Sequence, residues 1–201
     1  MALPKSTYVT EEEYLAFEQD SEIKHEYVAG EIFAMSGAGR KHNLIALNVS
    51  SDLHSQLANR PCEVYQSDMR VQVKATGAYR YPDIAVVCGE PEFSASQPES
   101  LLNPTLLIEI LSQSTASVDR GEKLAEYRRI PSLQEYLLIS QDAPRIERYL
   151  KQDAHNWLYT ELTGLDQQLA LPSIDCVLHF SDVFHRIDFQ SDGPTGDNIS
   201  D

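Results

Sequence analysis

The sequence predicts a mixed α/β fold in which helices flank one central sheet. Apolar residues recur every four positions between residues 41 and 58, which is the pattern of a long amphipathic helix. Short aliphatic runs at 84–87 and 106–111 are typical of buried strands. The overall succession of helix, hairpin, helix, strands, helix and strands supports one sheet with helices packed against it.

The first two elements are predicted by their end signals. Thr10 precedes a run of acids, and Glu13 completes a capping box, so a helix should begin there. The next segment, 24–35, has the composition of a β-hairpin that turns near Ala29-Gly30.

The middle of the chain alternates between strands, turns and helices. Pro131 stops the last helix of this region because proline cannot continue a helix ladder. We expect a helix over 41–58, strands at 63–66, 69–73, 81–88 and 105–111, a surface loop at 90–104, and a helix at 119–130.

The last part should add strands to the sheet. Residues 135–139 form a buried strand, and 145–150 with 157–162 suggest an antiparallel pair. The segment 189–201 contains no base and is rich in Gly, Ser and Asp, so we expect an acidic, disordered tail. The expected organisation is one domain over 1–188 followed by that tail.

Composition excludes several classes of protein. No apolar run approaches the roughly 20 residues of a membrane span, and no signal pattern is visible at the N-terminus, so we expect a soluble, cytoplasmic protein without a membrane partner. Cys62, Cys88 and Cys176 are far apart and odd in number. That spacing suits neither a disulfide framework nor a zinc site, and we interpret all three as small core or strand residues.

The formal net charge of −15 argues against a nucleic-acid partner at first sight, because basic side chains supply the affinity for phosphates. The acidity is concentrated at the two ends, however. Residues 32–151 carry thirteen bases against fourteen acids, so the middle of the chain is nearly neutral. The charge therefore weakens the nucleic-acid interpretation without excluding it.

Two carboxylates interrupt the apolar strands, and they are the first candidates for chemistry. Asp83 stands at the start of one run and Glu109 lies inside the other. A buried carboxylate needs a cation, a metal or hydrogen-bond donors. If the two strands are neighbours, both acids can project on one side and offer Mg²⁺ the one or two carboxylates that it usually takes.

Lys123 supplies a cation on the following helix, four residues after Asp119 and hence on the same helical face. Each residue alone has a structural alternative. Asp83 could cap a strand, Asp119 could cap a helix, and Glu109 could pair with any nearby base. An acid in the middle of an aliphatic strand has the fewest such explanations, which makes Glu109 the strongest single candidate.

Other polar residues carry weaker signals. His42, at the start of the long helix, could contact the site or a phosphate, but a helix-terminal or core histidine is the more ordinary interpretation. Glu31 could lie on the hairpin surface or behind the site. The remaining histidines have no ligand-like spacing, which disfavours a zinc hydrolase.

These residues together resemble a known family. The Pro-Asp strand followed by a strand with a central glutamate resembles the PD-(D/E)XK nuclease superfamily, and the fuller ordered set resembles its Uma-type branch. The resemblance spans about residues 8–187. It rests on Lys24-His25-Glu26-Tyr27, Gly30-Glu31-Ile32, Tyr81-Pro82-Asp83, Glu109-Ile110-Leu111-Ser112, Ser114-Thr115, Asp119, Lys123, Tyr127 and Glu135-Tyr136.

The resemblance implies a restriction-endonuclease-like fold, a mixed central sheet flanked by helices, DNA as substrate and often a homodimer. It also implies a divalent cofactor, Mg²⁺, for which Mn²⁺ can substitute. By position, Asp83 and Glu109 would be the metal ligands, Lys123 the catalytic lysine and Glu26 an additional catalytic acid. Supporting roles would fall to His42, Asp119 and Tyr127.

One position departs from the superfamily pattern. Leu111 stands two residues after Glu109, where the superfamily motif has its lysine, and Lys123 on the next helix would take that role. The expected function is therefore a Mg²⁺-dependent endonuclease that hydrolyses DNA phosphodiester bonds. The alternatives are a catalytically silent member that binds nucleic acid or protein, and an oligomeric structural protein.

Overall fold

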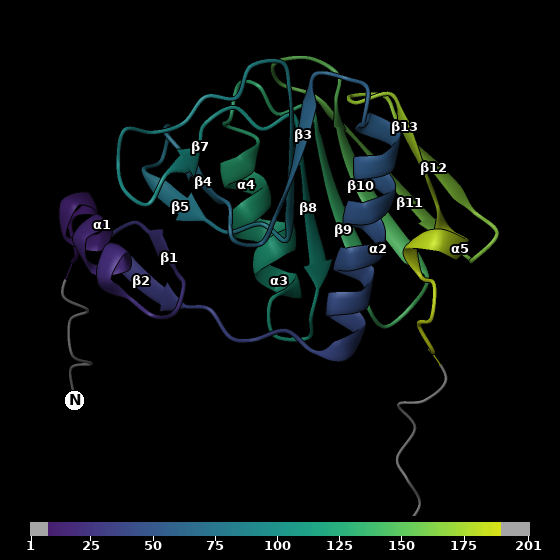
Figure 1. The fold of residues 1–201 in the computed structure, drawn as a ribbon, viewed down its shortest axis with the longest axis horizontal. Helices are drawn as coiled ribbons and strands as arrows, with labels where there is room; N and C mark the ends of the chain where they lie inside the picture. Colours follow the sequence, from purple (N-terminus) through teal and green to yellow (C-terminus); the bar gives the residue numbers. More distant parts are fainter. Residues whose placement is uncertain (1–7, 190–201) are drawn as a thin grey trace, which may run out of the picture.

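The structure, a computed structural model, describes residues 8–189 and is a mixed α/β fold with sheets flanked by helices (Figure 1). The largest sheet contains six strands in the order β11-β10-β9-β8-β6-β3. Their bounds are β3 (Cys62–Gln66), β6 (Ile84–Cys88), β8 (Leu106–Leu111), β9 (Glu135–Ser140), β10 (Arg145–Lys151) and β11 (Trp157–Thr163).

Two smaller sheets accompany it among the described residues. A five-stranded sheet has the order β2-β1-β5-β4-β7, and β12 pairs with β13. Their bounds are β1 (His25–Val28), β2 (Glu31–Ala34), β4 (Arg70–Val73), β5 (Ala78–Arg80), β7 (Ser100–Leu101), β12 (Gln168–Leu171) and β13 (Cys176–His179). The helical elements are α1 (Glu11–Asp20), α2 (Arg40–Leu57), α3 (Ala116–Val118), the π-helical turn η1 (Asp119–Lys123), α4 (Leu124–Tyr127) and α5 (Phe180–Val183).

The two faces of the six-stranded sheet pack against different partners. On one face, even-numbered residues of β6 and β8 such as Ile84 and Ile108 meet Ile45 and Leu53 of α2. On the other face, odd-numbered residues of these two strands form a second core with α4 and with strands of the five-stranded sheet. Figure 1 shows α2 along the first face, and α3 and α4 between the two sheets. Side-chain alternation along β8 therefore decides which residues face α4.

The end signals predicted several elements correctly. Thr10 and Glu13 form the capping box of α1 in both directions. β1 and β2 form the expected hairpin, and its turn residues Ala29 and Gly30 have φ values of 49° and 89°. Positive φ at both central residues matches the twist of a two-residue hairpin turn. The amphipathic helix and the antiparallel pair β10–β11 also lie within a few residues of their expected bounds.

Other boundaries were wrong. The helix expected over 119–130 begins at Ala116, passes through the π-helical turn and ends at Tyr127. The strand expected over 81–88 begins only at Ile84. The strand before it, β5, ends at Arg80 and belongs to the five-stranded sheet, so residues 81–83 connect the two sheets. The loop at 90–104 contains β7, which pairs with β4 in parallel. The expected tail lies almost wholly outside the described residues, which end at Phe189.

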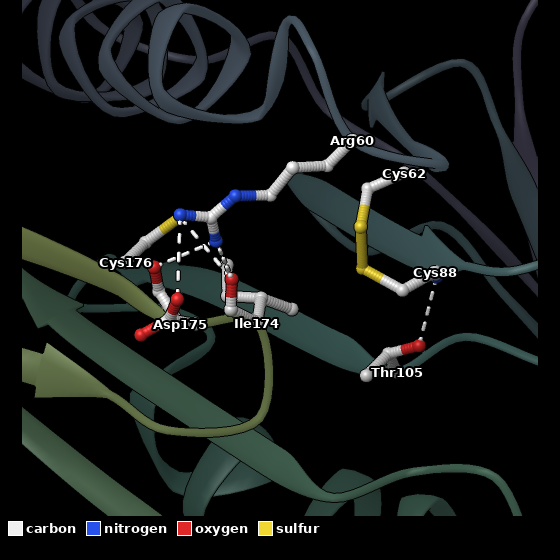
Figure 2. The surroundings of a disulfide bond; sticks show 7 residues. All are labelled: Arg60, Cys62, Cys88, Thr105, Ile174, Asp175 and Cys176. Carbon is white, nitrogen blue, oxygen red and sulfur yellow. Dashed lines mark hydrogen bonds and ion pairs between the residues drawn. A yellow bond between two sulfur atoms is a disulfide. The ribbon is translucent and has the colours of Figure 1, made fainter.

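The interpretation of the cysteines was also wrong. Cys62 and Cys88 form a disulfide (Figure 2), and they are register partners of the antiparallel pair β3–β6. Only Cys176 is the buried, free thiol that the sequence suggested. Two cysteines 26 residues apart meet because strand pairing brings them together, and spacing alone does not reveal that pairing.

No helix within residues 8–189 combines the length and the apolar composition that crossing a membrane would require.

Candidate functional site

The candidate site forms around Glu109, in the middle of β8. This strand is flanked by β6, which runs antiparallel to it, and by β9, which runs parallel. Glu109 points toward α4 with Leu107 and Leu111 and is 3% exposed. Its Oε1 accepts a hydrogen bond of 3.0 Å from Lys123 Nζ and another of 3.0 Å from the Tyr127 hydroxyl.

Lys123 closes the π-helical turn, and its ammonium group lies among carboxylates. Besides Glu109, its Nζ is 3.0 Å from Asp119 Oδ1 and 3.5 Å from Glu26 Oε1. Lys123 is only 6% exposed, so this cation is held inside the protein by surrounding acids. The lysine that the sequence places on a helix thus reaches the strand glutamate.

Asp83 precedes β6 and is tied directly to β8. Its Oδ2 accepts a hydrogen bond of 2.7 Å from the backbone N–H of Ile110, the residue after Glu109. The same oxygen lies 3.1 Å from His42 Nε2, in the first turn of α2. His42 therefore contacts the Pro-Asp carboxylate, which the ordinary interpretation of a helix-terminal histidine did not require.

Glu26 reaches the site from β1 in the other sheet. Its Oε2 is 2.7 Å from Arg80 Nη1, while its Oε1 faces Lys123. Arg80 is 3% exposed and also pairs with Glu126 at 2.8 Å through its Nε. Arg80 thus joins an acid of the five-stranded sheet to one on α4.

Sequence reasoning missed Arg80 and Glu126. The one available signal was a charged residue between Tyr79 and Tyr81, in a segment whose neighbours are apolar. The other candidates lie apart from the site. Glu31 is exposed on the hairpin, and His25 pairs with Glu18 at 3.0 Å.

The crowding of acids perturbs the titration of the site. Burial raises the pKa of Glu109 to about 8; the Lys123 charge opposes this rise, and the charges of Asp83, Asp119 and Glu26 add to it. Burial lowers the pKa of Lys123, but its carboxylate neighbours outweigh that effect and hold the pKa above its usual value. Burial, followed by the Glu109 charge, raises the pKa of the Tyr127 hydroxyl.

The donor set fits a hard divalent cation. Asp83 and Glu109 supply carboxylate oxygens from adjacent strands, and Mg²⁺ takes one or two carboxylates while keeping several waters. Within residues 8–189 no group of three or more His, Cys, Asp or Glu side chains is arranged to hold a metal ion. The two carboxylates would hold the metal, which would lower the pKa of a bound water and neutralise charge on a phosphate.

A solved structure shares this fold. A protein from Anabaena variabilis ATCC 29413, whose structure is titled that of a putative nuclease belonging to DUF820, superposes with a TM-score of 0.71. The match covers 88% of this chain and 97% of the other, at 20% sequence identity. At that identity the likeness establishes the shared fold.

Closer relatives occur in Synechocystis sp. (strain ATCC 27184 / PCC 6803 / Kazusa). Uncharacterized protein sll1609 is 38% identical over 169 residues, which is 84% of this chain and 96% of the relative. Uncharacterized protein slr1290 is 37% identical over 176 residues, 87% of this chain and 90% of the relative. The model of the Uma2 family, described as "Putative restriction endonuclease", matches residues 11–180. With that span and these relatives, the chain belongs to the Uma2 family and has a restriction-endonuclease-like fold.

Proposed function

We propose that this protein is a Mg²⁺-dependent endonuclease that hydrolyses phosphodiester bonds in DNA. The observation that carries the proposal is the approach of Lys123 Nζ to within 3.0 Å of Glu109 Oε1. Asp83, which precedes β6, accepts a hydrogen bond from the backbone N–H of Ile110, the residue after Glu109. The site thus contains the acids and the cation that phosphodiester hydrolysis requires, on adjoining elements. Membership in the Uma2 family, whose description is "Putative restriction endonuclease", adds support.

Each residue has a role in this proposal. Asp83 and Glu109 bind the metal, for which Mn²⁺ can substitute. Lys123 directs its ammonium group at a phosphate oxygen and stabilises the charge that develops there. Glu26 shares Lys123 with Glu109 and helps to orient the attacking water.

Three further residues support the site. Asp119 and Tyr127 hold Lys123 and Glu109 in position through the contacts of 3.0 Å described above. His42 fixes Asp83 from α2. Arg80 pairs with the other oxygen of Glu26 and so gives this buried acid a second cation besides Lys123.

Cleavage of supercoiled plasmid DNA in the presence of Mg²⁺ tests the function. Glu109→Gln and Lys123→Met should each lower the cleavage rate by at least about 100-fold, which is the scale of losing one transition-state contact. Glu135→Gln is a matched control, because Glu135 is a buried acid that accepts a hydrogen bond from the Ser173 hydroxyl and lies on the opposite side of β9 from Tyr136, which contacts Tyr127 of the site. Undiminished cleavage by either site variant would refute the assignment.

A catalytically silent, DNA- or protein-binding member is the competing proposal. One observation favours it: Lys123 already neutralises the acids, and both Lys123 and Glu109 are almost fully buried. Calorimetric titration with Mg²⁺ and Mn²⁺ separates the two. Binding that disappears in Asp83→Ala supports the enzyme, and an absence of heat in both proteins supports the silent member.

We also propose that residues 1–188 act as one domain and assemble as a homodimer. β11 ends the six-stranded sheet, and its Leu158 and Tyr159 are 49% and 48% exposed. An unpaired strand edge with apolar side chains can add a strand from a second copy. Sedimentation should give the mass of a dimer, and Tyr159→Lys should shift it to the monomer.

A further inference from the structure

Glu18 is a buried acid of α1 that has no role in the proposed function. It is 7% exposed, and both oxygens of its carboxylate have partners. Oε1 accepts hydrogen bonds from the backbone N–H of His25, at 3.0 Å, and from the hydroxyl of Tyr81, at 2.8 Å. Oε2 lies 3.0 Å from His25 Nδ1. One carboxylate thus joins α1 to β1 and to the connector 81–83 between the two sheets.

Both partners of Glu18 are chain neighbours of acids in the candidate site. His25 directly precedes Glu26, and Tyr81 stands two residues before Asp83. The backbone N–H of Tyr81 also donates to Glu26 Oε1 at 3.3 Å, and this is the oxygen that faces the ammonium group of the site. A displacement of Tyr81 would therefore move Asp83 through the chain and Glu26 through this hydrogen bond.

The link from Tyr81 to Asp83 is short and stiff. The residue between them is Pro82, whose ring fixes the backbone angle φ. Tyr81 is 4% exposed, and burial, followed by the hydrogen bond to Glu18, raises the pKa of its hydroxyl above the usual value. The hydroxyl therefore stays protonated at neutral pH and remains a donor to Glu18.

Attachment of α1 to the sheet does not explain this acid. The helix is already held by Tyr14, which belongs to a buried cluster with Tyr27 and Tyr79 and donates its hydroxyl to the backbone oxygen of His25 at 2.8 Å. An apolar residue at the position of Glu18 would extend such packing without the cost of burying a carboxylate. The acid is therefore better explained by the groups that it holds.

We propose that Glu18 is a positioning residue of the candidate active site. It holds β1 to the connector 81–83 and thereby sets the distance between Glu26 and Asp83. The inference rests on the proposed nuclease function for its chemistry, but the position of Asp83 can be measured without cleavage. Since the described contacts of Glu18 are with His25 and Tyr81, its loss should lower turnover and leave DNA affinity unchanged.

The Ile110 amide reports on the position of Asp83 in the metal-free, ¹⁵N-labelled full chain, because its N–H donates to Asp83 Oδ2 at 2.7 Å. Glu18→Ala should shift the NMR signal of this amide and speed its hydrogen exchange. The amide of Ile146, on β10, should keep its wild-type signal and serves as the internal reference. Glu12→Ala is the matched control, because Glu12 is an exposed glutamate of the same helix, and it should leave both signals unchanged.

Steady-state cleavage of plasmid DNA with Mg²⁺ gives the second measurement. Glu18→Ala should lower kcat roughly 10-fold to 100-fold, the range for losing a group that orients a metal ligand, with an unchanged KM for DNA. Glu18→Gln should recover most of kcat, because its amide oxygen can still accept from the Tyr81 hydroxyl and the His25 N–H. A role confined to stability would lower the thermal midpoint and leave kcat unchanged at a temperature where every variant is folded.

Tyr81→Phe removes one oxygen atom and keeps the buried ring, so it tests the link even where Glu18→Ala does not fold. It should lower kcat and shift the Ile110 amide in the same direction as Glu18→Ala. The double variant Glu18→Ala/Tyr81→Phe should be no slower than Glu18→Ala, because both changes break the same contact. Losses that multiply in the double variant would show two independent effects and reject the link.

The outcomes also separate this inference from the proposed function. If the wild type cleaves DNA, an unchanged kcat in folded Glu18→Ala or Tyr81→Phe, or a loss confined to KM, retains the nuclease and overturns the role of Glu18. If the wild type does not cleave, the nuclease is rejected and the Ile110 amide decides. A shift in these variants then retains Glu18 as the residue that positions Asp83, and an unmoved signal rejects it.

Discussion

Lys123 Nζ lies 3.0 Å from Glu109 Oε1 although the two residues belong to different kinds of element, a π-helical turn and a buried strand. Neither residue is more than 6% exposed. Each charge is therefore compensated almost entirely by protein groups. The pair is the physical centre of the site, and its removal should have unequal effects on stability.

Lys123→Met should destabilise the protein by about 3 kcal/mol, because it leaves Glu109, Asp119 and Glu26 with less positive charge in a buried place. Glu109→Gln should cost much less, since glutamine can still accept the hydrogen bond from Tyr127. Urea unfolding of both variants and of the double variant gives the coupling between the two residues. Equal losses in the single variants would contradict this account.

The stability of the metal-free protein should depend on pH through the carboxyl group of Glu109. Its pKa rises from 4.5 to about 8 on folding, so the folded state keeps a proton that the unfolded state releases. The stabilisation of the folded state by this proton is fully present below about pH 4.5 and is lost as the pH rises through about 8. The slope is at most about 1.4 kcal/mol per pH unit for one proton.

Comparison of wild type with Glu109→Gln isolates this effect, since all other groups titrate in both proteins. The free energy of unfolding of the wild type should fall relative to that of the variant between about pH 5 and pH 8. Parallel curves for the two proteins would show that the Glu109 carboxyl has an ordinary pKa.

His42 should act as a positioning residue for Asp83. Removing its imidazole in His42→Ala leaves Asp83 Oδ2 with only the Ile110 N–H among the contacts described above. Mg²⁺ affinity should then fall about tenfold, as is typical when a partner of a metal ligand is lost. Calorimetry measures this, and His42→Gln should restore part of the affinity because an amide can also donate to Asp83.

The thermal midpoint provides the control for His42. Although the His42 side chain is 84% buried, it lies in the first turn of an 18-residue helix whose apolar contacts come from later turns. Its loss should therefore leave the fold intact. Affinity that stays at the wild-type value in His42→Ala would show that Asp83 needs no such support.

Local signals predicted the elements that local physics determines. The capping box at Thr10 and Glu13, the four-residue repeat of α2 and the apolar run of β8 each depend on residues close in sequence. The Glu109–Lys123 pair was also predictable, because one residue is an acid in an aliphatic strand and resemblance pointed to the other.

Long-range partners were not predictable in the same way. Arg80 pairs with Glu26 and Glu126, which lie 54 and 46 residues away in sequence. The link depends on how the five-stranded sheet packs over α4, and no local pattern encodes that. The hairpin β12–β13 and the helix α5 were also missed, because each is only four residues long and carries little periodicity.

The disulfide should stabilise the edge of the six-stranded sheet. β3 has one neighbour in that sheet, β6, and Cys62–Cys88 ties these two strands at one end. Closing a chain segment of 26 residues restricts the unfolded state by about 3 to 4 kcal/mol in the chain-entropy account. A dithiol reductant should therefore lower the free energy of unfolding by that order, which urea titration measures.

Two further measurements distinguish this effect from a general action of the reductant. Alkylation in denaturant, which exposes the buried Cys176, should label one cysteine before reduction and all three after it. The Cys62→Ala/Cys88→Ala variant should unfold identically with and without reductant.

Since β8 and β9 each have a neighbouring strand on both sides and β3 has one only on one side, loss of the disulfide should speed amide exchange in β3 more than in β8. Equal acceleration in both strands would mean that the covalent link supports the whole sheet rather than its edge.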